Sequence, residues 1–203
     1  MEKRGAVILP VFAAMLGVLL AATGGTFAAS GHTPRNILPV EIFVAADPGL
    51  DSGCQAVLEA SDKLFTVPFH LYSTQASDGV HNGQPLSTET IFAGGAHYIL
   101  LNGKWQSSPV TSEQMKALEE RNRKNATNVS CHYLHDDSVN GESVAIYTMH
   151  SETQYSKNND QVWISKSKGV ILRHEIDMIS SRNNGKTHIS SRYEYGNVEA
   201  PKL

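Results

Sequence analysis

The sequence predicts an α+β domain built on one antiparallel β-sheet, with two helices packed against it. Two segments, near residues 51–65 and 111–124, place apolar residues at the three- and four-residue spacing of a helix. The segments between and after them alternate apolar and polar residues with a period of two, as strands do. Glycine and Asn-Gly pairs separate these strands, which favours hairpins and an antiparallel meander over alternating β-α-β units.

The first residues have the pattern of a secretory signal peptide. Residues 1–4 are mainly basic, Gly5–Ala22 contains no charged residue, and small residues such as Thr26 and Ala28 follow. Cleavage is expected after Ala28, or one or two residues later. A retained membrane anchor is the alternative, because the uncharged stretch reaches the lower length limit of a spanning helix. Pro10 interrupts that stretch and no basic cluster follows it, which favours the signal peptide.

The sequence therefore divides into a signal peptide at residues 1–28 and a single domain at residues 29–203. We expect the mature protein to be periplasmic or secreted, with no stable membrane span after cleavage. The formal net charge of −3 and the absence of a basic face disfavour nucleic acid as a partner. A hydrophobic fraction of 40% is too high for general disorder.

Two cysteines, Cys54 and Cys131, lie in the exported part of the chain. In an oxidising compartment an even pair predicts one disulfide. A metal-binding or nucleophilic role for a lone thiol is the alternative.

The first elements of the mature chain are an extended leader and a helix. Prolines punctuate residues 29–48, where a short strand is expected at Val40–Val44. Asp51 is the expected N-cap of a helix that runs to about Phe65. Its apolar residues recur at helical spacing: Ala56, Val57, Ala60 and Leu64.

Strands follow, interrupted once by the second helix. That helix is expected to begin after a cap at Thr111 or Ser112 and to run to about Lys124, with Met115 and Leu118 on its apolar side. The predicted strands are residues 67–72, Ser87–Ala93, Ala96–Leu101, Lys104–Gln106, Val129–Asp137, Glu142–Gln154, Asp160–Lys166, Ile171–Ile179 and Lys186–Tyr195.

The alternation assigns one apolar face to the sheet. Two short helices cover only part of such a face, so the sheet either hosts a ligand or closes on itself. An ordinary filled core is the alternative explanation for each residue. The face comprises Phe69, Leu71, Ile91, Ile99, Leu101, Ile146, Val162, Ile164, Ile176, Met178 and Ile189.

Signatures of catalysis are missing from the sequence. It contains no nucleophile elbow, no phosphate-binding loop, no dinucleotide fingerprint and no HExxH motif. We therefore expect no catalytic residue, no metal site and no cofactor.

Two clusters of polar residues nevertheless merit attention. His135 and Asp137 share a strand face, and His150 or His97 is a conceivable third ligand from a neighbouring strand. Glu175 and Asp177 are spaced as an acid–base pair, although Arg173 on the same face favours a solvated charge ladder.

The C-terminal third resembles a known family. Trp163-Ile164, Gly169 and Leu172-Arg173 form a hairpin line similar to that of periplasmic lipoprotein carriers of the LolA type, and Tyr193–Val198 resembles their final strand. The resemblance implies a strongly curved antiparallel half-barrel whose concave face is covered by the helices. It also implies binding of an acyl chain, or of a lipoprotein, in that concavity without catalysis.

Three functions remain open at this point. The first is a binding protein for a hydrophobic small molecule or lipid, with the ligand-binding residues Phe69, Leu71, Ile91, Ile99, Leu101, Met115, Leu118, Ile146, Val162, Ile164, Ile176 and Met178. The second is a structural or protein-interaction domain with a filled core. The third is a hydrolase or metalloenzyme.

Overall fold

The computed structural model describes residues 54–78 and 84–203. The predicted signal peptide, the strand at Val40–Val44 and the cap at Asp51 lie outside these residues. Within them the first helix begins at Gln55, and Cys54 occupies the N-cap position.

One open antiparallel sheet of nine strands forms the body of the protein, in the order β4-β3-β2-β1-β9-β8-β7-β6-β5. Every pairing follows chain neighbours except that of β1 with β9, which joins the first hairpins to the long C-terminal meander. The strands are β1 (Phe69–Ser77), β2 (Leu86–Ala93), β3 (Ala96–Leu101), β4 (Lys104–Ser107), β5 (Thr127–Val139), β6 (Glu142–Glu152), β7 (Ser156–Ser165), β8 (Ile171–Ser180) and β9 (Lys186–Glu194).

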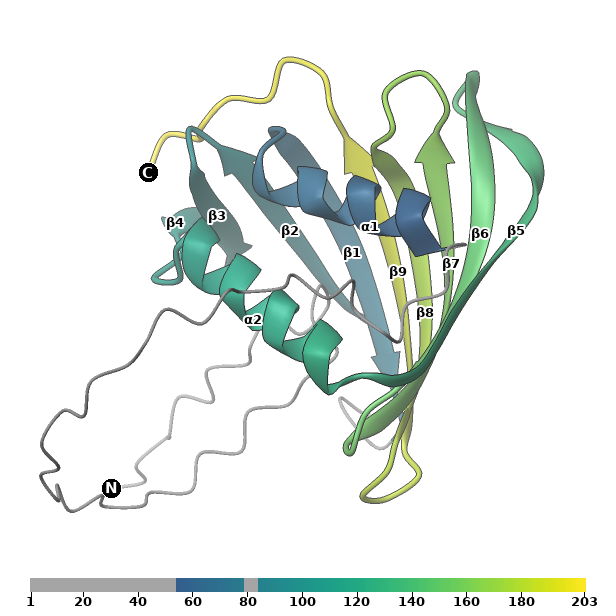
Figure 1. Cartoon of the computed structure of the whole chain (residues 1–203). Coiled ribbons are helices and arrows are strands. Elements are labelled where there is room, and N and C mark those ends of the chain that lie inside the picture. Colours follow the sequence, from purple (N-terminus) through teal and green to yellow (C-terminus); the bar gives the residue numbers. More distant parts are fainter. Residues whose placement is uncertain (1–53, 79–83) are drawn as a thin grey trace, which may run out of the picture.

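Both helices lie on the same face of this curved sheet. Figure 1 shows α1 (Gln55–Asp62) crossing the strands, with α2 (Ser112–Asn125) beside it toward β3 and β4. A short 3-10 turn, η3 (Lys63–Phe65), follows α1. The predicted α+β half-barrel with two covering helices is therefore confirmed. We call the helix-covered face of the sheet the inner face and the opposite one the outer face.

The predicted start of α2 is also confirmed. The Thr111 side chain accepts a hydrogen bond from the Gln114 amide at 3.2 Å, and the Gln114 side chain accepts one from the Thr111 amide at 2.9 Å. This reciprocal capping box satisfies two amides that a helix otherwise leaves without partners.

The main core lies between α1 and the inner face. Phe69 is fully buried at its centre and contacts Phe92, Tyr193 and Tyr195 edge-on or tilted, with ring centroids 5.6–6.4 Å apart. Aromatic side chains bury large areas and prefer such tilted contacts. The core cluster comprises Cys54, Val57, Ala60, Leu64, Phe69, Leu71, Phe92, Cys131, Val162, Ile164, Ile171 and Tyr193.

The strand register corrects the predicted face of Ile91 and Ile146. Ile91 pairs with His70, whereas its neighbour Phe92 pairs with Phe69, so Ile91 lies on the outer face. Ile146 pairs with Trp163 and likewise lies on the outer face. These strands carry apolar residues at consecutive positions, because both of their faces are buried there, and a period of two does not identify the inner side.

Outer-face residues form a second, smaller core cluster. It comprises Val144, Ile146, Trp163, Val170 and Leu172, with Val139 and Tyr195 packed against it.

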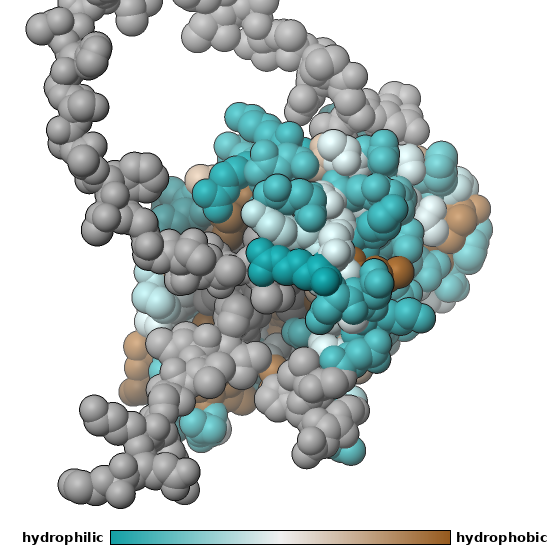
Figure 2. Space-filling model, turned by 90° about the horizontal axis from the view of Figure 1, so that it is seen from below, coloured by the Kyte–Doolittle hydropathy of each residue, from teal (hydrophilic) through white to brown (hydrophobic). Residues whose placement is uncertain are grey.

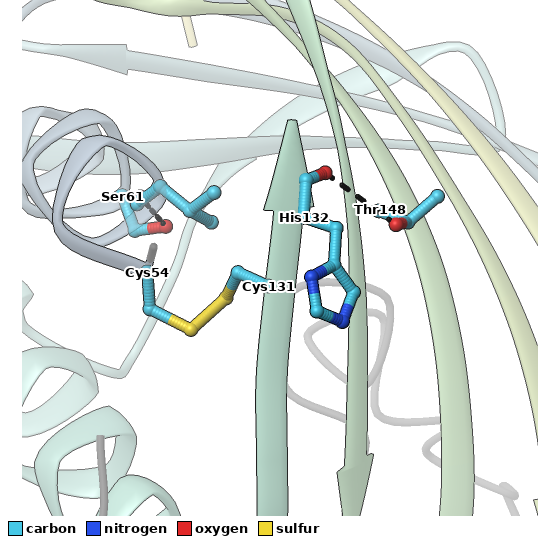
Figure 3. Close-up of a disulfide and its surroundings, with 6 residues drawn as sticks. Cys54, Ser61, Cys131, His132 and Thr148 are labelled. Carbon is cyan, nitrogen blue, oxygen red and sulfur yellow. Dashed lines mark hydrogen bonds between the residues drawn. A yellow bond between two sulfur atoms is a disulfide. The ribbon is translucent and has the colours of Figure 1, made fainter. Parts of the chain in front are cut away.

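The predicted disulfide joins the start of α1 to β5, a strand at the edge of the sheet. Cys54 precedes α1 and Cys131 lies on β5, with their Cα atoms 4.9 Å apart and 77 positions separating them in the sequence. Figure 3 shows the bond spanning from the helix to the strand. The prediction of one disulfide is confirmed, and the bond fixes the start of α1 over the inner face.

Candidate functional site

A cavity of about 180 Å³ lies between the two helices and the inner face. Its floor consists of inner-face residues of β5 to β9, and its walls come from α1, η3 and α2. The aliphatic and sulfur-containing side chains that line it are Val57, Leu58, Leu64, Met115, Ala126, Val129, Met149, Val162, Ile171, Ile176, Met178 and Ile189, together with the disulfide.

Four of the predicted ligand-binding residues line this cavity: Met115, Val162, Ile176 and Met178. They converge from α2 and from the two neighbouring strands β7 and β8. Met115 is almost fully buried, at 2% exposure, so α2 inserts one apolar side chain into the cavity wall.

The remaining predicted residues lie elsewhere. Phe69, Leu71 and Ile164 belong to the filled core beneath α1, and Ile99 is buried on β3 without lining the cavity. Four more predicted residues also lie outside the cavity lining. Leu118 is half-buried on α2, Leu101 is 38% exposed, and Ile91 and Ile146 lie on the outer face.

Sequence reasoning missed several lining residues. Val57 and Leu64 show helical spacing, but the prediction treated α1 only as a cover for the sheet. Met149 and Ile171 were not assigned to the apolar face, although Met149 pairs with inner-face residues of β5 and β7. Met149 has the same parity as Tyr147 on β6, but only the register, in which Tyr147 pairs with Val162, assigns that parity to the inner face.

The cavity also contains polar side chains from two sides. Asp160 and Asn158 on β7 and His174 on β8 lie on its floor, and Glu119, Asn122 and Arg123 reach it from α2. His174 Nε2 lies 3.5 Å from Asp160 Oδ2, and the two side chains are 17% and 6% exposed. Buried carboxylates are uncommon unless they are paired, so this cluster is a distinctive feature of the site.

The α2 side of the cluster carries opposite charges. Arg123 Nε lies 3.8 Å from Glu119 Oε1, and Arg123 Nη2 donates a hydrogen bond of 2.8 Å to Asp62 at the end of α1. Burial raises the pKa of Glu119, an effect opposed mainly by the positive charge of Arg123. The Arg123–Asp62 pair is a direct polar link between the two helices.

The histidines do not assemble into a metal site in the part of the chain that the structure describes. His97 is 2% exposed and stacks on Phe92, with ring centroids 4.7 Å apart, inside the core. Burial lowers its pKa from 6.5 to about 4. His150 contacts Asn159 and Glu152, not His135.

The carboxylate pair of β8 belongs to a surface charge ladder. Glu175 accepts a hydrogen bond from Arg173 Nε at 2.8 Å, and His188 bridges Glu175 and Asp177 at 3.1 and 2.8 Å. Their partners are therefore polar side chains of the outer face, Arg173 and His188 among them, as expected for a charge ladder.

The surface seen from below is mainly hydrophilic. Figure 2 shows teal over most of the coloured atoms and brown in a few small areas. Among the described residues, no helix combines the length and the apolar content needed to cross a lipid bilayer.

The sequence matches no protein-family model and no curated protein. Solved structures to which the fold is similar include the lipoprotein LppX of Mycobacterium tuberculosis, with 10% identity, a TM-score of 0.41, and 78% of this chain and 99% of that chain covered. LprF of Mycobacterium bovis has 11% identity and a TM-score of 0.36, with 74% and 94% covered.

A putative outer membrane lipoprotein-sorting protein domain of Vibrio parahaemolyticus is also similar. It has 9% identity and a TM-score of 0.23, with 71% of this chain and 93% of that chain covered. The likeness to these three structures is one of fold.

Proposed function

We propose that this protein is exported and binds a hydrophobic or amphiphilic ligand, such as an acyl chain or the lipid part of a lipoprotein, without catalysis. The observation that carries the proposal is the cavity under α1 and α2, whose lining is mainly aliphatic. Transfer of apolar surface from water into such a lining gains about 25 cal/mol per Å².

The size of the cavity bears on how a ligand enters. Sites for drug-sized molecules usually measure about 300–1,000 Å³, whereas this cavity measures about 180 Å³. A long acyl chain therefore requires the cavity to widen. In this proposal the structure is the closed form, and one of the two helices moves.

The helix with fewer attachments is α2. Only Ser112 and Met115 of α2 are buried, and Ser112 donates a hydrogen bond of 3.0 Å to the Gly95 carbonyl. By contrast, α1 buries Val57 and Ala60 in the main core and is tied to β5 by the disulfide. In this proposal α2 is the lid and α1 is a fixed wall.

Export is part of the same proposal. The signal peptide predicted at residues 1–28 directs the chain to an oxidising compartment, where the Cys54–Cys131 disulfide is stable. Residues 29–203 then form the mature domain, in the periplasm or outside the cell.

Native mass spectrometry of the exported protein, purified without detergent, tests this function. We expect an adduct of lipid mass that disappears on denaturation and is recovered by organic extraction. A protein without an adduct, which also takes up no lipid from mixed vesicles, would instead favour a structural domain with a filled core. A stoichiometric metal ion would favour the metalloenzyme alternative.

A further inference from the structure

The polar side chains that line the cavity indicate what kind of ligand head group can bind there. Asp160 Oδ1 and Arg123 Nε are both buried, and neither has a hydrogen-bond partner among the residues that the structure describes, although Glu119 Oε1 lies 3.8 Å from Arg123 Nε. One is an acceptor on the floor of the cavity, and the other is a donor on the lid. Buried polar groups without partners are costly, so a bound molecule that satisfies both gains affinity.

The groups around these two atoms are also polar and buried. The Asp160 side chain is only 6% exposed, and its other oxygen faces His174 at 3.5 Å. The Asn158 amide beside it bonds Ser151 at one end, at 3.4 Å, and its other end has no partner within the described chain. A purely apolar ligand would make no hydrogen bond to these groups, each of which loses water when α2 closes.

Hydrogen-bonding capacity disfavours two kinds of head group. A carboxylate or a fully ionised phosphate has no hydrogen to donate, so it would leave the Asp160 acceptor without a partner. An ammonium group donates to Asp160 but cannot accept from Arg123, whose charge opposes it. A hydroxyl group both donates and accepts, so it can join the acceptor on the floor to the donor on the lid.

We propose that the cavity is specific for neutral amphiphiles with free hydroxyl groups, which Asp160 and Arg123 bind from opposite walls while the aliphatic lining holds the chain. This inference rests on the proposed function and specifies its ligand. It also gives α2 a reason to close, because the ligand's hydroxyl groups bridge the lid and the sheet.

Competition for a neutral fluorescent dye, phenylnaphthylamine, tests the specificity. The delipidated protein is titrated with monopalmitoylglycerol, methyl palmitate, palmitate and hexadecylamine, which share a long chain and differ in head group. We expect monopalmitoylglycerol to bind at least about tenfold more tightly than methyl palmitate, the gain expected from satisfying a buried charged group. Palmitate and hexadecylamine should bind no better than the methyl ester.

Substitutions at Asp160 assign the preference to this site. Asp160→Leu should abolish the tenfold difference, and Asp160→Asn, which keeps a neutral acceptor, should leave an intermediate one. The matched control is Asp177→Leu on the neighbouring strand, where the side chain is 73% exposed on the outer face and the preference should persist. Circular dichroism of each variant establishes that it is folded.

The outcomes separate the inference from the function on which it rests. If all four amphiphiles displace the dye equally, the binding function stands and the hydroxyl specificity is wrong. Retention of the preference by folded Asp160→Leu would contradict the assignment to this site. If none of the amphiphiles binds, the proposed function fails, and the inference fails with it.

Discussion

His97 shows how one residue can fit the fold without serving the site. Its imidazole is a common metal ligand. Here, however, the ring is buried against Phe69 and Phe92, with ring centroids 6.3 and 4.7 Å away. In that environment the neutral imidazole is favoured, because the charged form would lose its hydration. The residue therefore acts as a core aromatic side chain, and its burial lowers the stability of the fold only at acidic pH.

The pH dependence of stability tests this placement. The folded pKa of His97, about 4, lies below the unfolded value of 6.5, so the unfolded state takes up the proton first as the pH falls. Relative to His97→Gln, the native protein should lose up to about 3 kcal/mol of stability between pH 6.5 and pH 4. Urea unfolding across this range measures the difference.

The control is His132→Gln, since His132 is exposed on β5. It makes the same chemical change at an exposed position. A difference between His97→Gln and the native protein that does not change with pH would mean that the buried imidazole is not held in its neutral form.

At the scale of elements, the two helices cover the same face with different attachments. The disulfide and the buried residues of α1 fix one wall of the cavity, while α2 is held by Met115, by one hydrogen bond to Gly95 and by the Arg123–Asp62 pair. The inner side of α2 presents Glu119 and Arg123 to the cavity as well as Met115. A cover with few apolar contacts and a polar inner side is suited to repeated opening.

Removal of the disulfide tests the role of α1 as the fixed wall. The double variant Cys54→Ser, Cys131→Ser should lose about 2–5 kcal/mol of unfolding free energy, as is usual for a native disulfide. Hydrogen exchange should increase mainly in α1 and around Cys131, because the helix is then held by packing alone. Protection that stays unchanged in α1 would mean that the bond does not position the helix.

At the scale of the whole molecule, the sequence predicted the elements well and the site in part. The alternation and turn residues identified all nine strands and both helices of the described region. The start of β7 at Ser156 was missed, because residues 156–159 are polar and show no alternation, yet they pair with both β6 and β8. Backbone pairing to two neighbours forms a strand there without help from the pattern.

The face of each residue was harder to predict than its strand. Where both sides of a strand are buried, as at Ile91 and Ile146, the hydrophobic pattern has no period, and only the register assigns the face. Asp160 and Arg123 come from distant segments of the chain, so no local sequence motif predicts that they lie in one cluster. The disulfide was predictable because parity and export leave one pairing for two cysteines.

A pair of adjacent substitutions tests whether a long apolar ligand occupies the cavity between α2 and the inner face, as we propose. Met178 lines the cavity, whereas Ile179 points to the outer face and is 37% exposed. Binding of phenylnaphthylamine is measured by fluorescence titration for the native protein, Met178→Trp and Ile179→Trp. We predict at least about tenfold weaker binding for folded Met178→Trp, since the indole fills the space, and native affinity for Ile179→Trp. Equal affinity of all three proteins would place the ligand elsewhere and contradict the claim.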